Sequence, residues 1–286
     1  MNTELSDFST TAANPAQVGD TAFTGSVPEL YERLLVPLIF ESYAADLAAR
    51  VAFRQPRTVL EIAAGTGVVT RHLASALPRE TSIVATDLNQ AMLDRAMAAD
   101  TSGRVAWQQA DAMALPFADE SFDAVVCQFA AMFFPDKAKA FAEARRVLRP
   151  GGSFLFSVWD RIEDNEFADT VTRALEGLFP KNPPRFLARV PHGYFDLSLI
   201  EQDLTRGGFE RTPEAITLPA RSRAATPDLP AIAYCQGSPL RGEIEAFGAS
   251  HLAEVTSVAA AAIAAQFGPG PVEGRIQAHV LRIERP

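Results

Sequence analysis

The sequence predicts an α/β fold built on a doubly wound, mostly parallel sheet. Between Arg57 and Trp159, short β-branched or aromatic runs alternate with longer helical stretches, as in successive βαβ units. Each of these runs is interpreted as a strand that is buried on both faces. The composition, with 48% hydrophobic and 21% charged residues, is that of an ordinary globular chain. A length of 286 residues allows one large α/β domain or two small ones.

Five strands and three helices are expected in this part of the chain. The strands are Thr58–Ile62, Ser82–Thr86, Arg104–Gln109, Phe122–Cys127 and Ser153–Trp159. The helices are Val68–Leu77, Gln90–Ala99 and Lys137–Leu148. Asn89 is a suitable cap for the second helix, and Arg149-Pro150-Gly151-Gly152 forms a turn that ends the third.

The flanking segments show weaker patterns. Pro28–Phe53 is amphipathic at helical spacing, with Pro37 expected to kink the helix. Residues 1–20 lack the basic cluster and apolar core of a secretory signal and are expected to form a flexible tail. Downstream, the patterns predict helices near Glu166–Leu178 and Leu199–Arg206, strands Phe209–Leu218 and Arg275–Glu284, and a helical insertion at Asp228–Phe267.

Charge and cysteine content exclude several function classes. The 26 basic and 35 acidic residues give a net charge of −9, which disfavours nucleic acid as a partner. The longest apolar run, Val258–Ala265, is far shorter than the ~18–20 residues that cross a bilayer. Cys127 and Cys235 belong to no Cys/His cluster, so no metal site is expected, and two isolated cysteines suit the reducing cytoplasm.

The strongest motif runs from Val59 to Val68, where an apolar strand is followed by a glycine-containing turn and then a helix. Such a turn directs free backbone N–H groups towards a ligand, and Gly65 and Gly67 let the ligand approach the main chain. Asp87 ends the second strand 20 residues after Gly67, where a carboxylate can accept both hydroxyls of a ribose. The motif therefore predicts a nucleoside ligand.

Two residues favour one nucleoside cofactor over another. Thr70 occupies the position where a dinucleotide fingerprint has its third glycine, which weakens the interpretation as a nicotinamide-dependent enzyme. Glu61, at the start of the turn, suits a ligand with an ammonium group better than one with a pyrophosphate. S-adenosylmethionine has an adenosine and an ammonium group and no phosphate.

From Arg57 to Asp160 the sequence resembles the class I S-adenosylmethionine-dependent methyltransferases, in particular the ubiquinone/menaquinone-biosynthesis branch. The resemblance rests on four motifs in order: Glu61 to Gly67 with Ala63 in place of the first glycine, Ala85 to Asn89, Gln109 to Phe117, and Asp119 to Val125, followed by the turn Leu148 to Gly152. It implies a Rossmann-like seven-stranded sheet whose last strand is antiparallel.

The resemblance also implies roles for individual residues. Asp87 would bind the ribose, Asp111 would accept a hydrogen bond from the adenine amine, and Gln128 would lie beside the methionyl group. The full set of implied cofactor-binding residues is Tyr31, Glu61, Ala63, Gly65, Gly67, Asp87, Leu88, Met92, Asp111, Ala112 and Gln128. S-adenosylmethionine is the expected cofactor, with S-adenosylhomocysteine as product.

The acceptor side is expected to be aromatic. Phe23, Phe133, Trp159 and Tyr194 are candidate substrate-binding residues, because an aromatic wall suits both a sulfonium and an apolar acceptor. His192, in a loop with turn residues and aromatics, is the candidate general base or substrate contact.

The expected function is methyl transfer to a small, fairly apolar or aromatic acceptor by in-line displacement, with O-, N- and C-methylation all open. The alternatives are a nicotinamide-dependent oxidoreductase and a non-catalytic S-adenosylmethionine-binding protein. Residues 21–286 are expected to form a single domain, with a helical lid at 21–55, a cofactor-binding core at 56–160 and the substrate side at 161–286. A monomer and a homodimer remain equally open.

Overall fold

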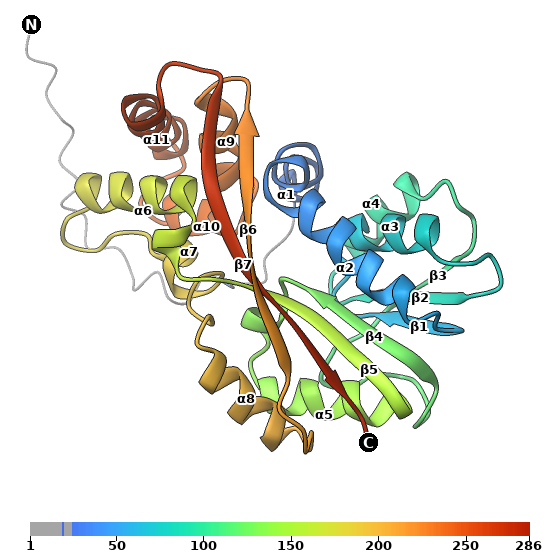
Figure 1. Ribbon diagram of the computed structural model, residues 1–286. Helices are drawn as coiled ribbons and strands as arrows, with labels where there is room; N and C mark the ends of the chain where they lie inside the picture. Colours follow the sequence, from blue (N-terminus) through green and yellow to red (C-terminus); the bar gives the residue numbers. More distant parts are fainter. Residues whose placement is uncertain (1–18, 20–24) are drawn as a thin grey trace, which may run out of the picture.

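A seven-stranded sheet forms the centre of the molecule, shown in Figure 1 as a computed structural model that describes residue 19 and residues 25–286. The strand order is β3-β2-β1-β4-β5-β7-β6. The strands are β1 (Thr58–Glu61), β2 (Ser82–Asp87), β3 (Val105–Gln109), β4 (Phe122–Gln128), β5 (Leu148–Trp159), β6 (Glu214–Ala224) and β7 (Val272–Glu284). Strands β1 to β5 are parallel, whereas β7 runs antiparallel to β5 and β6. The expected fold class, including the antiparallel last strand, is confirmed.

Helices cover both faces of the parallel strands (Figure 1). On one face lie α2 (Glu41–Phe53), α3 (Val68–Ala76) and α4 (Gln90–Ala99). On the other lie α5 (Lys137–Val147) and α8 (Leu197–Arg206). Strands β1 and β4 are largely buried, as expected. The expectation is wrong for β3, which lies at the edge of the sheet and has no fully buried residue.

The chain enters the sheet through an irregular helical segment. It consists of α1 (Val27–Leu30), the π-helix η2 (Tyr31–Phe40) and α2. Pro37 lies inside η2, where its missing N–H group cannot contribute to a regular helical ladder. The expected disturbance at Pro37 therefore takes the form of a π-helix rather than a kink between two α-helices.

A second group of helices surrounds the far ends of β6 and β7 (Figure 1). It contains α6 (Glu166–Leu178), α7 (Phe186–Arg189), and the helices inserted between β6 and β7, which are α9 (Asp228–Gln236), α10 (Leu240–Glu245) and α11 (His251–Phe267). The buried Glu243 carboxylate joins the insertion to α7: it accepts the backbone N–H groups of Arg185 and Phe186 at 2.7 and 2.9 Å and pairs with Arg189 at 2.8 Å.

Strands β5, β6 and β7 differ most from the expected boundaries, and β6 runs to Ala224 instead of ending at Leu218. β6 starts at Glu214 and not at Phe209, because the Phe209 ring packs into the core against Phe154 directly after α8. β7 begins three residues earlier than expected, at Val272. β5 includes the expected turn, because the backbones of Gly151 and Gly152 pair with Arg285 at 2.8 and 2.9 Å.

Short 3-10 turns occur at η3 (Ala131–Phe133) and η4 (Ile162–Asp164). No helix among residues 25–286 is long and apolar enough to cross a membrane.

Candidate functional site

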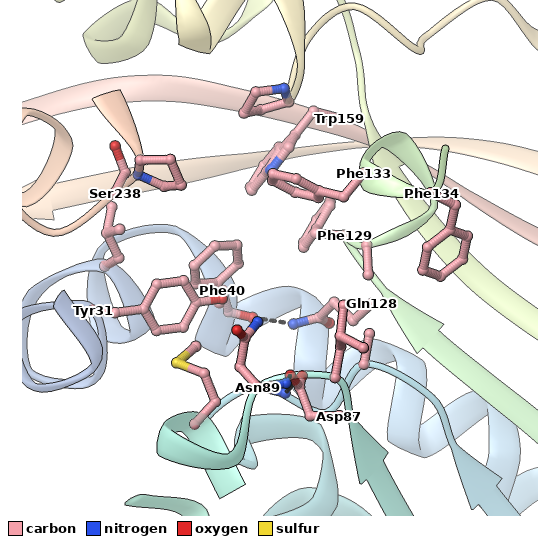
Figure 2. A pocket seen from close by; sticks show the side chains of 18 of the residues that line it. Tyr31, Phe40, Asp87, Asn89, Gln128, Phe129, Phe133, Phe134, Trp159 and Ser238 are labelled. Carbon is pink, nitrogen blue, oxygen red and sulfur yellow. Dashed lines mark hydrogen bonds between the residues drawn. The ribbon is translucent and has the colours of Figure 1, made fainter. Parts of the chain in front are cut away.

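A cavity opens at the carboxyl ends of the central strands, beneath the N-terminal helical segment (Figure 2). One end is polar, with Asp87, Asn89 and Gln128, and the other is aromatic, with Phe133 and Trp159; Tyr31 and Phe40 lie between the two ends. The polar end is referred to below as the cofactor end and the aromatic end as the acceptor end. Ligands bind at this edge of an open α/β sheet because the loops that follow the strands diverge there.

Asp87, the last residue of β2, is fixed by the backbone. Its Oδ2 accepts the Gly65 N–H and its Oδ1 accepts the Asn89 N–H, both at 2.8 Å. Burial raises the pKa of the carboxyl group, and the two backbone N–H bonds counteract that effect. Each oxygen has a second lone pair, so the oriented carboxylate can still accept the hydroxyl groups of a ribose.

The turn after β1 adopts left-handed backbone angles. Gly65 has φ +57° and lines the cavity, which leaves the main chain exposed to a ligand. Ala63, also lining the cavity, has φ +54°, an uncommon angle for a residue with a Cβ atom. Strained backbone of this kind is concentrated at functional sites.

Gly67 has a different role from Gly65. It does not line the cavity, and a Cβ atom there would lie 2.9 Å from Trp107 and 3.2 Å from the Ala96 Cβ. Its φ of +82° also favours glycine. The structure therefore indicates that Gly67 allows the turn to pack closely on α4 and β3.

Glu61 lies behind the turn and is not among the residues that line the cavity. Its side chain is buried, and its Oε2 accepts the Thr70 hydroxyl at 2.5 Å. Burial raises the pKa of Glu61 to about 8 despite this hydrogen bond. Thr70, at the position of a dinucleotide-binding glycine, is thus the partner of the buried acid.

The other cofactor-end residues of the prediction lie together. Leu88, Met92, Asp111 and Ala112 all line the cavity, and Asp111 Oδ1 accepts the Met113 N–H at 2.8 Å. The Tyr31 ring lies between the two ends, stacked on Phe40 at 5.1 Å between centroids, and its hydroxyl group points towards Gly65 at the cofactor end. Burial and the nearby Asp87 carboxylate raise the pKa of the Tyr31 hydroxyl, so it is a neutral group at pH 7.

Gln128, at the end of β4, has a side-chain oxygen that could bind the methionyl group. Its Nε2 donates to the Phe40 carbonyl oxygen at 3.5 Å, whereas its buried Oε1 has no hydrogen-bond partner among the described residues (Figure 2). A buried acceptor without a partner costs roughly 1–3 kcal/mol. An ammonium group in the cavity would supply the missing donor.

The acceptor end is formed by rings from several distant segments. Trp159 stacks on Phe129 with centroids 3.8 Å apart and an interplanar angle of 4°, and Phe40 lies 5.9 Å from Trp159. Phe133 and Phe186 complete the wall, 6.2 Å apart. Phe129 itself has φ +50°, so strained non-glycine residues occur at both ends of the cavity.

His192 also lines the cavity, next to Trp159, with ring centroids 5.9 Å apart. Its Nδ1 lies 2.8 Å from the Asp160 carbonyl oxygen. Burial lowers the pKa of the imidazole to about 4. His192 is therefore neutral at pH 7 and a weak base.

One predicted substrate-binding residue, Tyr194, is not among the residues that line the cavity. Tyr194 is buried elsewhere, where its hydroxyl donates to Asp203 at 2.8 Å and Lys137 lies over its ring. Phe23 lies outside the described residues. Other cavity residues were not among the predicted site residues. Asn89 and Phe129 directly follow the predicted Leu88 and Gln128, whereas Leu35, Ile39, Ala130, Phe186 and Tyr234 carry no such signal.

Comparison with known proteins agrees with this geometry. A family model described as a methyltransferase domain matches residues 60–156. The ubiquinone/menaquinone biosynthesis C-methyltransferase UbiE of Marinomonas sp. is 30% identical over 172 residues, which are 56% of this chain and 68% of the relative. The demethylmenaquinone methyltransferase of Deinococcus radiodurans is 34% identical over 155 residues, which are 50% of this chain and 64% of the relative.

A solved structure shares the fold. Phosphoethanolamine N-methyltransferase 2 of Haemonchus contortus, in complex with phosphomonomethylethanolamine and S-adenosylhomocysteine, superposes with a TM-score of 0.56 at 18% identity. The match covers 96% of this chain and 61% of that one. At this identity the likeness is one of fold alone.

Fold, motifs and relatives together define the class: the chain belongs to the class I S-adenosylmethionine-dependent methyltransferases. Within that class its similarity is to the ubiquinone/menaquinone-biosynthesis branch. S-adenosylmethionine is its cofactor and a small molecule its methyl acceptor.

Proposed function

We propose that this enzyme methylates a small, fairly apolar or aromatic acceptor held at the acceptor end of the cavity. The observation that carries the proposal is the division of one continuous cavity into a polar end and an aromatic end. The polar end has the groups that a nucleoside and an ammonium group need. The aromatic end offers apolar surface that favours a ligand of the same character.

The cofactor-end residues have complementary tasks in this proposal. Asp87 accepts hydrogen bonds from the ribose hydroxyls, and Asp111 accepts one from the adenine amine. Gln128 Oε1 accepts a hydrogen bond from the methionyl ammonium group. Leu88, Met92 and Ala112 provide apolar surface around the adenine. Glu61 acts from behind the turn, through Thr70 and the backbone, since it does not line the cavity.

Bound S-adenosylmethionine supplies a methyl group on a positively charged sulfur, which is already an activated leaving group. The protein's contribution is to align the acceptor with that methyl group and to exclude water. The rings of Tyr31, Phe40 and Trp159 face the middle of the cavity, where their π-systems favour a positive charge.

Calorimetric titration with S-adenosylmethionine, S-adenosylhomocysteine and NAD tests the cofactor assignment. We expect micromolar binding of the first two and none of NAD. Asp87→Ala should weaken S-adenosylhomocysteine binding by about 100-fold, because two oriented charge-assisted hydrogen bonds are lost. Asp94→Ala is the matched control, as it removes an exposed carboxylate seven residues away on α4.

S-adenosylhomocysteine formation with a panel of small aromatic acceptors then tests catalysis. Turnover that depends on the acceptor supports the proposal. Tight cofactor binding with no turnover on any neutral aromatic or apolar compound would favour the non-catalytic alternative.

We also propose that the enzyme acts in the cytoplasm without a nucleic-acid partner. Both cysteines are buried free thiols, consistent with a reducing compartment. The net charge of −9 opposes binding to a phosphate backbone. Size-exclusion chromatography with light scattering would decide between a monomer and a homodimer.

A further inference from the structure

The imidazole of His192 is held in one tautomer by the cavity wall. Its Nδ1 lies 2.8 Å from the Asp160 carbonyl oxygen, and a carbonyl oxygen can only accept a hydrogen bond. The proton of the neutral ring is therefore on Nδ1, and Nε2 carries a lone pair. Among the described residues, no hydrogen bond or ion pair engages His192 Nε2.

The carbonyl group that sets this tautomer is itself fixed. The Asp160 carbonyl oxygen also accepts from Asn165 Nδ2 at 3.3 Å. The Asp160 carboxylate accepts hydrogen bonds from Gln277 Nε2 and from the Arg161 N–H, both at 2.7 Å. It also lies 3.3 Å from His279 Nε2. With backbone and side chain both held, Asp160 is a rigid support for the His192 ring.

The protonation state agrees with this arrangement. Burial lowers the pKa of His192 to about 4, although the hydrogen bond to Asp160 and the Asp160 and Glu163 charges act in the opposite direction. At pH 7 the ring is a neutral hydrogen-bond acceptor and a poor proton acceptor.

The charges of the cavity restrict the acceptor further. Among the described residues that line it there is no lysine or arginine, and the carboxylates of Asp87 and Asp111 are present. A carboxylate or phosphate on the acceptor would be buried here without a counter-charge from the lining side chains, which is unfavourable.

We propose that His192 is a specificity-determining residue that selects a neutral acceptor by receiving a hydroxyl or N–H hydrogen bond at Nε2. This inference rests on the proposed function for the place of the acceptor in the cavity. It assigns His192 to substrate positioning, and the general-base role is set aside.

The experiment titrates the S-adenosylhomocysteine-saturated protein at pH 7 with three probes of one ring system: 2-naphthol, 2-methoxynaphthalene and 2-naphthoate. We expect 2-naphthol to bind about 10-fold more tightly than 2-methoxynaphthalene, which lacks the donor. We expect 2-naphthoate to bind more weakly than 2-naphthol by at least the same factor.

Two variants assign the discrimination to His192. His192→Phe keeps an aromatic ring without an acceptor and should bring the naphthol-to-methoxynaphthalene ratio to within about twofold of one. His192→Gln keeps a side-chain oxygen and should retain a ratio of about 3 or more. Both variants should bind S-adenosylhomocysteine within about threefold of the unmodified protein, which shows that their cofactor end is intact.

The inference is overturned if His192→Phe retains the full ratio, if 2-naphthoate binds as tightly as 2-naphthol, or if 2-naphthol does not bind at millimolar concentration. Failure of the proposed function would be visible separately, as loss of S-adenosylhomocysteine binding by the unmodified protein. The three probes are then titrated against the protein alone, and their ratios decide the inference in the same way.

Discussion

The two ends of the cavity are built from the chain in different ways. The cofactor end takes most of its residues from one stretch, Ala63 to Gln128. Most of them lie at or just after the ends of neighbouring parallel strands. The acceptor end combines rings from η2, the β4–η3 junction, the end of β5, the segment around α7 and α9. A polar site that needs fixed backbone geometry is thus encoded locally, whereas an apolar site emerges from packing between distant segments.

The acceptor end also belongs to the hydrophobic core. Phe40, Phe129, Trp159 and Tyr234 line the cavity and are buried in the main apolar cluster. Changing the acceptor end should therefore alter stability and binding together, whereas changes to the polar side chains of the cofactor end should alter mainly binding.

Trp159→Ala is expected to have the largest effect on stability. It removes a ring that is 4% exposed and stacked on Phe129, which should lower the free energy of unfolding by about 3–5 kcal/mol in urea denaturation. Phe53→Ala is the control, because Phe53 is 87% exposed and its loss should change stability by less than about 0.5 kcal/mol. If Trp159→Ala lowered the free energy of unfolding by less than about 1 kcal/mol, the aromatic wall of the acceptor end would not contribute to the stability of the core.

Gly67→Ala should come next. The left-handed angle costs roughly 1–2 kcal/mol for alanine, and the contact with Trp107 adds about 1–3 kcal/mol. Gly103→Ala is the matched control, because Gly103 has a similar backbone angle, φ +63°, but open space around its Cβ position. It should lose only the free energy that the left-handed backbone angle costs an alanine. Equal losses of unfolding free energy for the two variants would contradict the packing role of Gly67.

Glu61→Gln should change how stability depends on pH. The folded pKa of about 8 lies above the unfolded value of 4.5, so the unfolded state loses its proton first and stability falls between pH 4.5 and pH 8. Replacing the carboxyl group should stabilise the protein at pH 8 relative to pH 5 by at least about 1.4 kcal/mol, the equivalent of one pKa unit. Melting curves at pH 5 and pH 8 provide the measurement. If the stability difference between the two pH values is the same in Glu61→Gln as in the unmodified protein, Glu61 is ionised in both states.

The smallest effect is expected where the N-terminal segment meets the glycine turn. Arg71 donates to Glu32 and to the Thr66 carbonyl oxygen, both at 2.8 Å, in a partly exposed pair. Arg71→Met should lower stability by less than about 1 kcal/mol and weaken S-adenosylhomocysteine binding about 2- to 3-fold. Calorimetry at low and high salt should show the difference shrinking as salt rises; a salt-independent loss would point to packing instead.

Most of the sheet could be predicted because its strands are continuous apolar runs separated by capping and turn residues. The predicted bounds of β6 and β7 are less accurate. Exposed apolar residues such as Ile216 obscure the alternating pattern, and Phe209 belongs to the core but to no strand. Asp87 and Gln128 reach the cavity as expected, because the residue that ends a parallel strand lies at the ligand-binding edge.

Side-chain direction could not be predicted in the same way. Glu61 ends β1 as Asp87 ends β2, yet one faces the core and Thr70 while the other faces the cavity. Tyr194 is turned towards Asp203 and Lys137 by the packing of α5 on α8, which no local pattern reveals. The aromatic wall depends on tertiary contacts of the same kind.

The π-helix η2 has a consequence for how this enzyme can diverge. Tyr31, Leu35, Ile39 and Phe40 all line the cavity from that one segment. Deleting one residue between Tyr31 and Phe40 would advance the helix by one position, a rotation of about 100° that turns Tyr31 away from the ligand. A single-codon deletion there would therefore change the lining of both ends of the cavity at once, with the sheet left untouched.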